Sequence, residues 1–176
     1  MVDLFSHTCG IKRRPMFMFG VIADAHYADV DDGWNHMRTR KRCYRRSLSL
    51  VKTAVSDWLS KPVGVSFVLQ LGDLIDGKNA VRHSSETAAT VTCSELVRTG
   101  VPVYHAWGNH DLYCFSRSDL LKSSMLNSSL AKTVSTPVRG STGYYHFSPV
   151  NGFRFVVLDQ YEVSMLGYDE DSDCYR

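Results

Sequence analysis

The chain has 176 residues and a formal net charge of +2, with 44% of its residues hydrophobic and 22% charged. This length and composition are typical of one soluble globular domain, and the small net charge argues against nucleic-acid or membrane partners. The five cysteines are odd in number and lack CxxC spacing, which argues against a disulfide framework and indicates a reducing, cytoplasmic compartment.

The start of the chain reads as a leader followed by a buried strand. Residues 1–15 are polar and basic without periodicity, so we expect a loose leader before a domain that spans 16–176. The run 16–23 is continuously apolar, which predicts a strand covered on both faces. Basic residues precede this run as in a signal peptide, but it is too short to span a bilayer and ends at Asp24 and His26 instead of a cleavage site.

The next segment has the period of a helix. Apolar residues recur at helical spacing from residue 44 onward, and Pro62 and Gly64 close the pattern. The residues expected to face inward are Tyr44, Leu48, Val51, Val55 and Leu59. Six basic residues crowd the start of this helix, namely Arg38, Arg40, Lys41, Arg42, Arg45 and Arg46. We expect most of them to be solvated and one or two to face an anionic substrate.

The remaining elements complete an alternating pattern. Strands are predicted at 65–71 and 101–107, with a helix between them that Ser84 or Ser85 caps and that ends near Arg98. A short helix over 118–127 overlaps a long loop over 123–143, and Asn151-Gly152 joins two strands of a hairpin over 144–159. This order predicts an α/β fold with a βαβαβ start on a largely parallel sheet, followed by a β-hairpin.

A polar motif follows each of the three buried strands. The motifs are Asp24-Ala25-His26, Gly72-Asp73-Leu74-Ile75-Asp76-Gly77 and Gly108-Asn109-His110-Asp111. Ligands of such sheets bind beyond the carboxyl ends of the strands, so we expect the three motifs to meet at one edge. Their carboxylates, imidazoles and amide suit divalent ions such as Mn²⁺ or Mg²⁺.

Each motif has a chemical interpretation and a structural alternative. In an extended segment Asp24 and His26 point to the same side and can bind one ion, although a capping aspartate and a surface histidine would also fit. Asp73 can bridge two ions, which lie roughly 3.5–4 Å apart in such sites, whereas Asp76 is expected to cap a turn. Asn109 offers a neutral ligand; the alternative is a buried asparagine in a turn.

The second half of the third motif is interpreted as catalytic. We expect His110 to point away from the ligands and to act on the substrate. Asp111 is expected to hydrogen-bond the imidazole of His110 and hold it in place.

In this order the motifs D-x-H, G-D-x-x-D and G-N-H-D resemble the calcineurin-like metallophosphoesterase superfamily. Within it, segments such as 68–77, 107–110 and 153–159 are similar to the manganese-dependent diphosphatases of ADP-ribose and CDP-alcohols. The resemblance implies an αββα sandwich, two Mn²⁺ ions and hydrolysis of the pyrophosphate bond in a small nucleoside diphosphate conjugate. It further implies that Asp24, His26 and Asp73 hold the first ion. Asp73 and Asn109 then hold part of the second, while His110 assists the transfer.

The chain also departs from that family. The family needs later histidines, including a Gly-His-x-His motif, whereas His146 alone follows the third motif here and is expected to be a sheet residue. We therefore expect an amino-terminal piece, incomplete at its C-terminal end. The alternatives are a catalytically silent fragment, or a phosphomonoesterase, phosphoprotein phosphatase or cyclic-nucleotide phosphodiesterase of the same superfamily.

The substrate contacts are expected near the first and third motifs. Aromatic side chains can stack on a base and arginines can bind phosphate. The candidates are Trp34, His36, Arg40, Arg45, Tyr113 and Phe115. We also expect a monomer in which the apolar residues of the hairpin face water, because strands that should cover them are absent.

Overall fold

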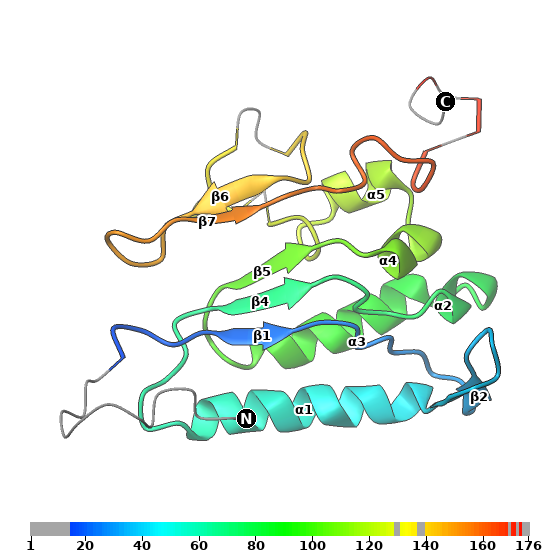
Figure 1. Ribbon diagram of the computed structural model, residues 1–176, viewed down its shortest axis with the longest axis horizontal. Coiled ribbons are helices and arrows are strands. Elements are labelled where there is room, and N and C mark those ends of the chain that lie inside the picture. The colour runs from blue at the N-terminus through cyan, green and yellow to red at the C-terminus, as the bar shows by residue number, and fades with distance from the viewer. Residues whose placement is uncertain (1–14, 129–130, 137–139, 169, 172, 174–176) are drawn as a thin grey trace.

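The core of the chain is a three-stranded parallel sheet (Figure 1). The computed structural model describes residues 15–128, 131–136, 140–168, 170, 171 and 173. The strands β1 (Gly20–Ile22), β4 (Val68–Leu71) and β5 (Val103–Ala106) lie in the order β1-β4-β5. Helix α1 (Tyr44–Ser60) connects the first two strands, and α3 (Ser85–Val97) precedes the third. The predicted α/β class and βαβαβ start are confirmed.

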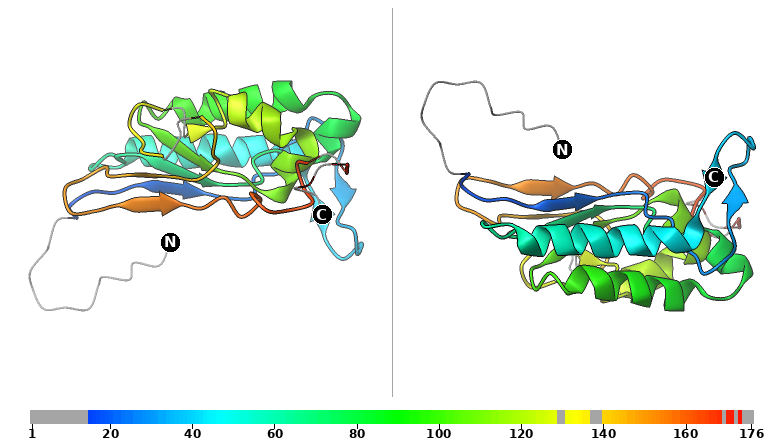
Figure 2. Two further views of the ribbon diagram at one scale, coloured as in Figure 1. Left: turned by 90° about the horizontal axis from the view of Figure 1, so that it is seen from above. Right: turned by 90° about the horizontal axis from the view of Figure 1, so that it is seen from below.

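Both long helices cover the same face of this sheet, as the two views in Figure 2 show. Val51 and Val55 of α1 are buried as predicted, but Leu59 is 53% exposed and Trp58 is buried in its place. The prediction for Leu59 was wrong because the indole fits against Gly20, where a Cβ atom would lie 2.8 Å from the ring. Only a glycine on β1 allows Trp58 to approach this closely.

The predicted cap of α3 is only half right. Ser84 occupies the N-cap position, yet its hydroxyl bonds to Oδ1 of Asn79 at 3.1 Å and not to an amide of the helix. Ala88 and Leu96 are buried, while Val91 is only partly buried.

Several short elements differ from the prediction. Strands β2 (Gly33–Trp34) and β3 (Lys41–Arg42) pair as a small antiparallel ribbon. Helix α2 (Lys78–Val81) follows the second motif, and α4 (Asn109–Cys114) begins inside the third. Helix α5 (Arg117–Lys122) is shorter than the helix predicted over 118–127. Residues 129–130 and 137–139 of the predicted loop lie outside the described residues, as does the leader up to residue 14.

The predicted hairpin forms from β6 (Tyr145–Phe147) and β7 (Phe155–Val157), which pair antiparallel. Gly152 has a φ of +86° in its turn, a conformation that glycine adopts without strain. His146 pairs with Val156 and Ser135, which confirms that it is a sheet residue.

The hairpin packs against the face of the sheet that the helices leave open. Tyr145 and Phe147 are each 2% exposed and pack with Phe67 and Tyr104. The expectation that these residues face water was therefore wrong, because the aromatic residues of the parallel sheet cover them. The opposite side of the hairpin is open, with Val156 64% exposed. Helices, parallel sheet and hairpin are thus three successive layers of the described part of the chain.

Candidate metal centre

The three motifs meet at the carboxyl ends of β1, β4 and β5. Backbone hydrogen bonds join the first two motifs: the N–H of Asp24 donates to the Gly72 carbonyl at 3.2 Å and that of His26 to the Asp73 carbonyl at 2.9 Å. Gly72, at a φ of +97°, lies so close to the third motif that a Cβ atom would be 2.7 Å from the Gly108 nitrogen.

The first motif is not extended, contrary to our expectation. Asp24 and His26 have φ values of 53° and 48°, and Asp73 has 52°, all in the left-handed region. Left-handed non-glycine residues are strained and gather at functional sites. The N–H groups of Asp24 and His26 turn toward carbonyls of the second motif, and these hydrogen bonds favour the left-handed conformation over the extended one.

Three potential ligand atoms nevertheless converge. Nε2 of His26 lies 3.7 Å from Oδ1 of Asp24 and 3.6 Å from Oδ2 of Asp73. Two carboxylates and an imidazole are suitable ligands for Mn²⁺ or Mg²⁺. These atoms come from two strand ends, so the sheet itself sets their separation.

The other nitrogen of His26 supports the same interpretation. Nδ1 is buried and makes no hydrogen bond to any described residue, although Oδ2 of Asp76 lies 3.5 Å away. A histidine that binds a metal usually directs its second nitrogen at a carboxylate, which fixes the tautomer. Asp76 is the largest cause of a raised pKa at His26; burial opposes the shift and Asp73 adds to it. The residues present therefore fit a divalent cation at Nε2.

Asp73 connects the strand ends. It is buried, its Oδ2 faces His26, and its Oδ1 accepts the N–H of His110 at 2.8 Å. Asn109, the first residue of α4, is half-buried directly after β5. An aspartate so placed has one oxygen toward each side of the site, as a bridging ligand needs.

His110 belongs to the same cluster. Ligand atoms of His26, Asp73 and His110 lie within 4.8 Å of one another, and the two imidazole rings are 4.3 Å apart. However, Nδ1 of His110 accepts the N–H of Gly77 at 3.0 Å. The neutral ring must then carry its proton on Nε2, which makes that nitrogen a donor. Burial, followed by the nearby His26, lowers the pKa of His110 and favours this neutral form.

Asp111 does not contact His110 as expected. Its carboxylate accepts the N–H groups of Gly108 and Asp73, each at 2.9 Å, and that of Leu74 at 3.1 Å. The prediction was wrong because α4 starts at Asn109, which turns Asp111 back toward the N-terminal amides of its own helix. Burial raises the pKa of Asp111 to about 6. This residue ties the second motif to the third.

The sequence did not indicate the contacts of two residues at the site, Asp76 and Arg42. Asp76 accepts the Lys78 N–H at 3.0 Å as the predicted cap, but its Oδ2 also lies 3.4 Å from Nδ1 of His110 and 3.2 Å from Nη1 of Arg42. Burial opposes its ionisation, yet the nearby imidazole of His26 and the N–H of Lys78 outweigh burial and lower the pKa of Asp76. Two features of the sequence could have indicated them. Asp76 is the second carboxylate between Gly72 and Gly77, and Arg42 belongs to the basic cluster at the start of α1.

The candidate substrate residues fall into two groups. Trp34 and His36 line an open hollow of about 680 Å³ on the β2–β3 ribbon, and Arg40 is exposed at its tip. The ring of Tyr113 lies 5.2 Å from that of His110. Thus Tyr113 lies at the metal motifs, whereas Trp34, His36 and Arg40 lie on the β2–β3 ribbon.

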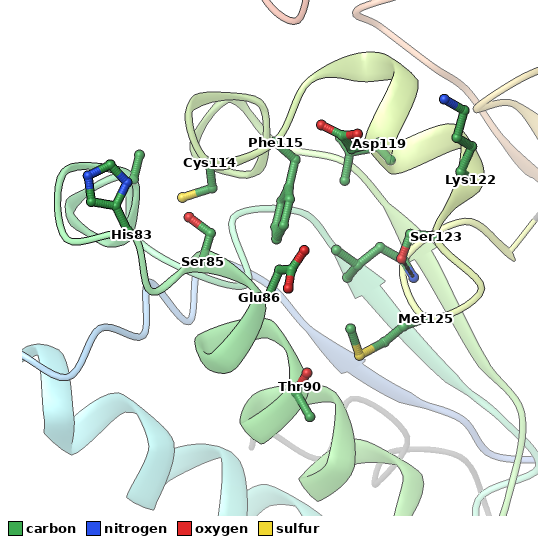
Figure 3. Close-up of a pocket in the computed structure, with 13 residues that line it drawn as sticks. His83, Ser85, Glu86, Thr90, Cys114, Phe115, Asp119, Lys122, Ser123 and Met125 are labelled. Carbon is green, nitrogen blue, oxygen red and sulfur yellow. Dashed lines mark hydrogen bonds between the residues drawn. The ribbon is translucent and has the colours of Figure 1, made fainter.

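Arg45 and Phe115 are directed elsewhere. Arg45 contacts Asp29 at 2.5 Å and Asp31 at 2.6 Å, so its charge is already paired. Phe115 lines a second hollow of about 690 Å³ between α3 and α5, where it lies among Glu86, Asp119 and Met125 (Figure 3). Neither side chain meets the three motifs.

Comparisons with known proteins agree with this geometry. The model of the calcineurin-like phosphoesterase family matches residues 17–168. Manganese-dependent ADP-ribose/CDP-alcohol diphosphatases are similar: that of Mus musculus is 45% identical over 93% of this chain, and that of Danio rerio 46% over 90%. A crystal structure of a dimetal phosphatase from Danio rerio superposes with a TM-score of 0.83 at 44% identity over 92% of this chain.

These matches cover only part of the relatives. The aligned region is 49% of the mouse and zebrafish diphosphatases and 50% of the crystallised chain. The chain thus spans about half the length of the relatives it matches. Because the family model matches most of the sequence, the chain belongs to the calcineurin-like phosphoesterase family.

Proposed function

We propose that the chain is the amino-terminal portion of a metal-dependent phosphohydrolase that cleaves the pyrophosphate bond of nucleoside diphosphate conjugates such as ADP-ribose and CDP-alcohols. The observation that carries the proposal is the convergence of Asp24 and Asp73 on Nε2 of His26, with Nδ1 directed at Asp76. The names of the relatives support manganese as the cofactor and these conjugates as the substrates.

In this proposal Asp24, His26 and Asp73 hold one ion, while Asp73 and Asn109 contribute to a second. When bound, such ions polarise phosphoryl oxygens and lower the pKa of water, with Mn²⁺ proposed and Mg²⁺ a possible substitute. His110 donates its Nε2 proton to a phosphoryl or leaving-group oxygen, because Gly77 holds Nδ1 as an acceptor. Oδ2 of Asp76 orients the imidazole of His26.

A second candidate function is a catalytically silent metal-binding fragment. Among the described residues, the second ion has only the shared Asp73 and the Asn109 amide as ligands. Further histidines would have to come from sequence that corresponds to the second half of the relatives, so we propose that the domain over 16–176 is incomplete at its C-terminal end. Other superfamily activities use the same centre and differ in their substrate loops.

The cellular location and the oligomeric state of the protein are also proposals, and they rest on less specific observations. No helix among the described residues is long and apolar enough to cross a membrane. The cysteine spacing supports a cytoplasmic location, and a monomer that binds a small-molecule substrate remains our proposal.

The function is tested with Mn²⁺ titrations and hydrolysis assays. Residues 1–176 should bind Mn²⁺ weakly and hydrolyse ADP-ribose or CDP-choline negligibly, because two-ion catalysis needs both cations to hold the attacking and leaving oxygens. The same residues fused to the second half of the Danio rerio diphosphatase should hydrolyse both in an Mn²⁺-dependent manner. A well-folded fusion that binds Mn²⁺ but hydrolyses neither conjugate would contradict the proposed substrate class.

A further inference from the structure

Strand β7 also ends at the edge of the sheet where the three motifs meet, which we call the metal edge. In Figure 1 the arrow of β7 points in the same direction as those of β1, β4 and β5. Its carboxyl end therefore lies at the edge where the three motifs meet. The β2–β3 ribbon lies below this edge in that view and the segment after β7 lies above it. A substrate at the motifs would have one of these structures on each side.

A buried ion pair anchors this segment. The side chains of Arg117 and Asp159 are 7% and 1% exposed and are in direct contact. The guanidinium also lies 5.5 Å from the ring centres of both Trp107 and Tyr168. Burying two charges is costly unless further hydrogen bonds compensate, so the remaining partners of this pair indicate what it holds in place.

Those remaining partners are the two backbone groups of Tyr161. Its N–H donates to Oδ1 of Asp159 at 3.1 Å, and its carbonyl accepts from Nη1 of Arg117 at 3.3 Å. Each end of the ion pair thus fixes one polar group of a single residue. With its backbone held from both sides, Tyr161 presents its side chain in a defined direction.

Packing and nearby charges relate that side chain to the metal edge. Tyr161 is half-buried and packs against the main hydrophobic core. Burial is the largest cause of a raised pKa at its phenol; a hydrogen bond with Gln160 opposes the shift, and the charges of Asp73, Tyr113 and Asp111 raise the pKa further. The phenol is therefore within electrostatic reach of the motif carboxylates and stays protonated, so it can donate a hydrogen bond.

Building on the proposed function, we propose that Tyr161 contacts the substrate. Its hydroxyl donates to an oxygen on the arm of the nucleoside diphosphate conjugate that lies away from the β2–β3 ribbon. Arg117 and Asp159 are positioning residues that act through Tyr161. The buried ion pair therefore serves recognition of the substrate, in addition to its structural contacts.

The test uses residues 1–176 labelled with 3-fluorotyrosine and observed by ¹⁹F NMR, with Tyr161→Phe identifying the resonance. Paramagnetic Mn²⁺ should broaden the Tyr161 resonance, and ADP-ribose added with Mg²⁺ should shift it. Tyr161→Phe should weaken ADP-ribose binding by about 3- to 10-fold, as expected for one hydrogen bond, and leave Mn²⁺ affinity unchanged.

Tyr168→Phe is the matched control. It keeps the ring beside Arg117 and removes a hydroxyl that donates to the Glu162 carbonyl at 2.7 Å, so ADP-ribose affinity should stay within about twofold. Arg117→Lys should weaken ADP-ribose binding, and adding Tyr161→Phe to it should cause no further loss, since both act on one contact.

The outcomes separate this inference from the proposed function. The ring ¹H signals of His26 report on the metal centre. If Mn²⁺ fails to broaden them, the proposed metal centre is wrong. If His26 is broadened but ADP-ribose does not shift Tyr161, or if Tyr161→Phe binds ADP-ribose like the parent chain, the inference is overturned.

Discussion

The metal edge and the aromatic core under the hairpin are held together by different physical means. At the edge, Asp111 receives three backbone N–H groups and left-handed residues bring the loops into contact. Under the hairpin, aromatic rings stack, with Tyr104 and Phe147 only 3.5 Å apart between ring centres. Directional hydrogen bonds hold the motif loops in one arrangement, whereas apolar packing tolerates volume-conserving changes. The comparison indicates that substitutions at the edge should affect chemistry and substitutions under the hairpin should affect stability.

The sharpest way to break this distinction is Asp73→Asn. The amide removes the charge proposed to bridge two ions, so Mn²⁺ affinity should fall by about 100-fold or more, as should hydrolysis by the fused enzyme. Calorimetric Mn²⁺ titration measures the first effect and the conjugate assay the second. Retention of activity within a few-fold of the parent would rule out a bridging role.

The variant His110→Ala tests whether His110 acts as a metal ligand or as a proton donor at the metal edge. Because Gly77 occupies Nδ1, we expect Mn²⁺ affinity to stay nearly constant while hydrolysis by the fused enzyme slows by about 10²–10⁴-fold. The two measurements are made on the same preparation. An equal loss of Mn²⁺ binding would show that His110 is a ligand.

The parallel sheet, away from the metal motifs, should respond to pH through His105. This histidine is buried, its Nδ1 lies 3.2 Å from Oε1 of Gln70, and burial lowers its pKa from 6.5 to about 4. The unfolded chain binds the proton more tightly than the folded one, so the free energy of unfolding is complete above pH 6.5 and falls as pH drops toward 4. The loss should reach about 3 kcal/mol.

Urea unfolding between pH 4 and 7 measures this slope. His105→Gln removes the titrating ring, so its free energy of unfolding should depend less on pH over the same range. An unchanged slope in His105→Gln would assign the effect to other groups.

The smallest effect is expected for Phe147→Leu. It trims an aromatic residue that is 2% exposed, so the free energy of unfolding should fall by about 1–2 kcal/mol. Mn²⁺ affinity should not change, because the hairpin core lies on the sheet face and not at its edge. A substantial loss of Mn²⁺ binding in this variant would show that the two regions are coupled.

Much of this architecture was predictable because it depends on local patterns. The helical period of α1, the Asn151-Gly152 turn and the apolar runs before each motif specify their elements within a few residues. The meeting of the motifs at one edge follows from parallel strands alone. The identities of Asp24, His26 and Asp73 as candidate ligands follow from their chemistry and from that placement.

The partners of the side chains could not be predicted in the same way. Asp73 and Asp111 are 38 positions apart, and Arg42 and Asp76 are 34 apart, so no local pattern relates them. The start of α4 at Asn109 decides that Asp111 turns to backbone amides instead of His110. Close packing against Gly20 likewise selects Trp58 over Leu59.

By itself the sequence determined the order of strands and helices, the edge where the three motifs meet and the residue types available there. Only the tertiary structure decided which nitrogen of each imidazole is free and that Asp76 lies beside two histidines. The physical reason is that propensity and period act over a few residues. The direction of a side chain, in contrast, is set by the hydrogen bonds and close contacts made when distant segments pack together.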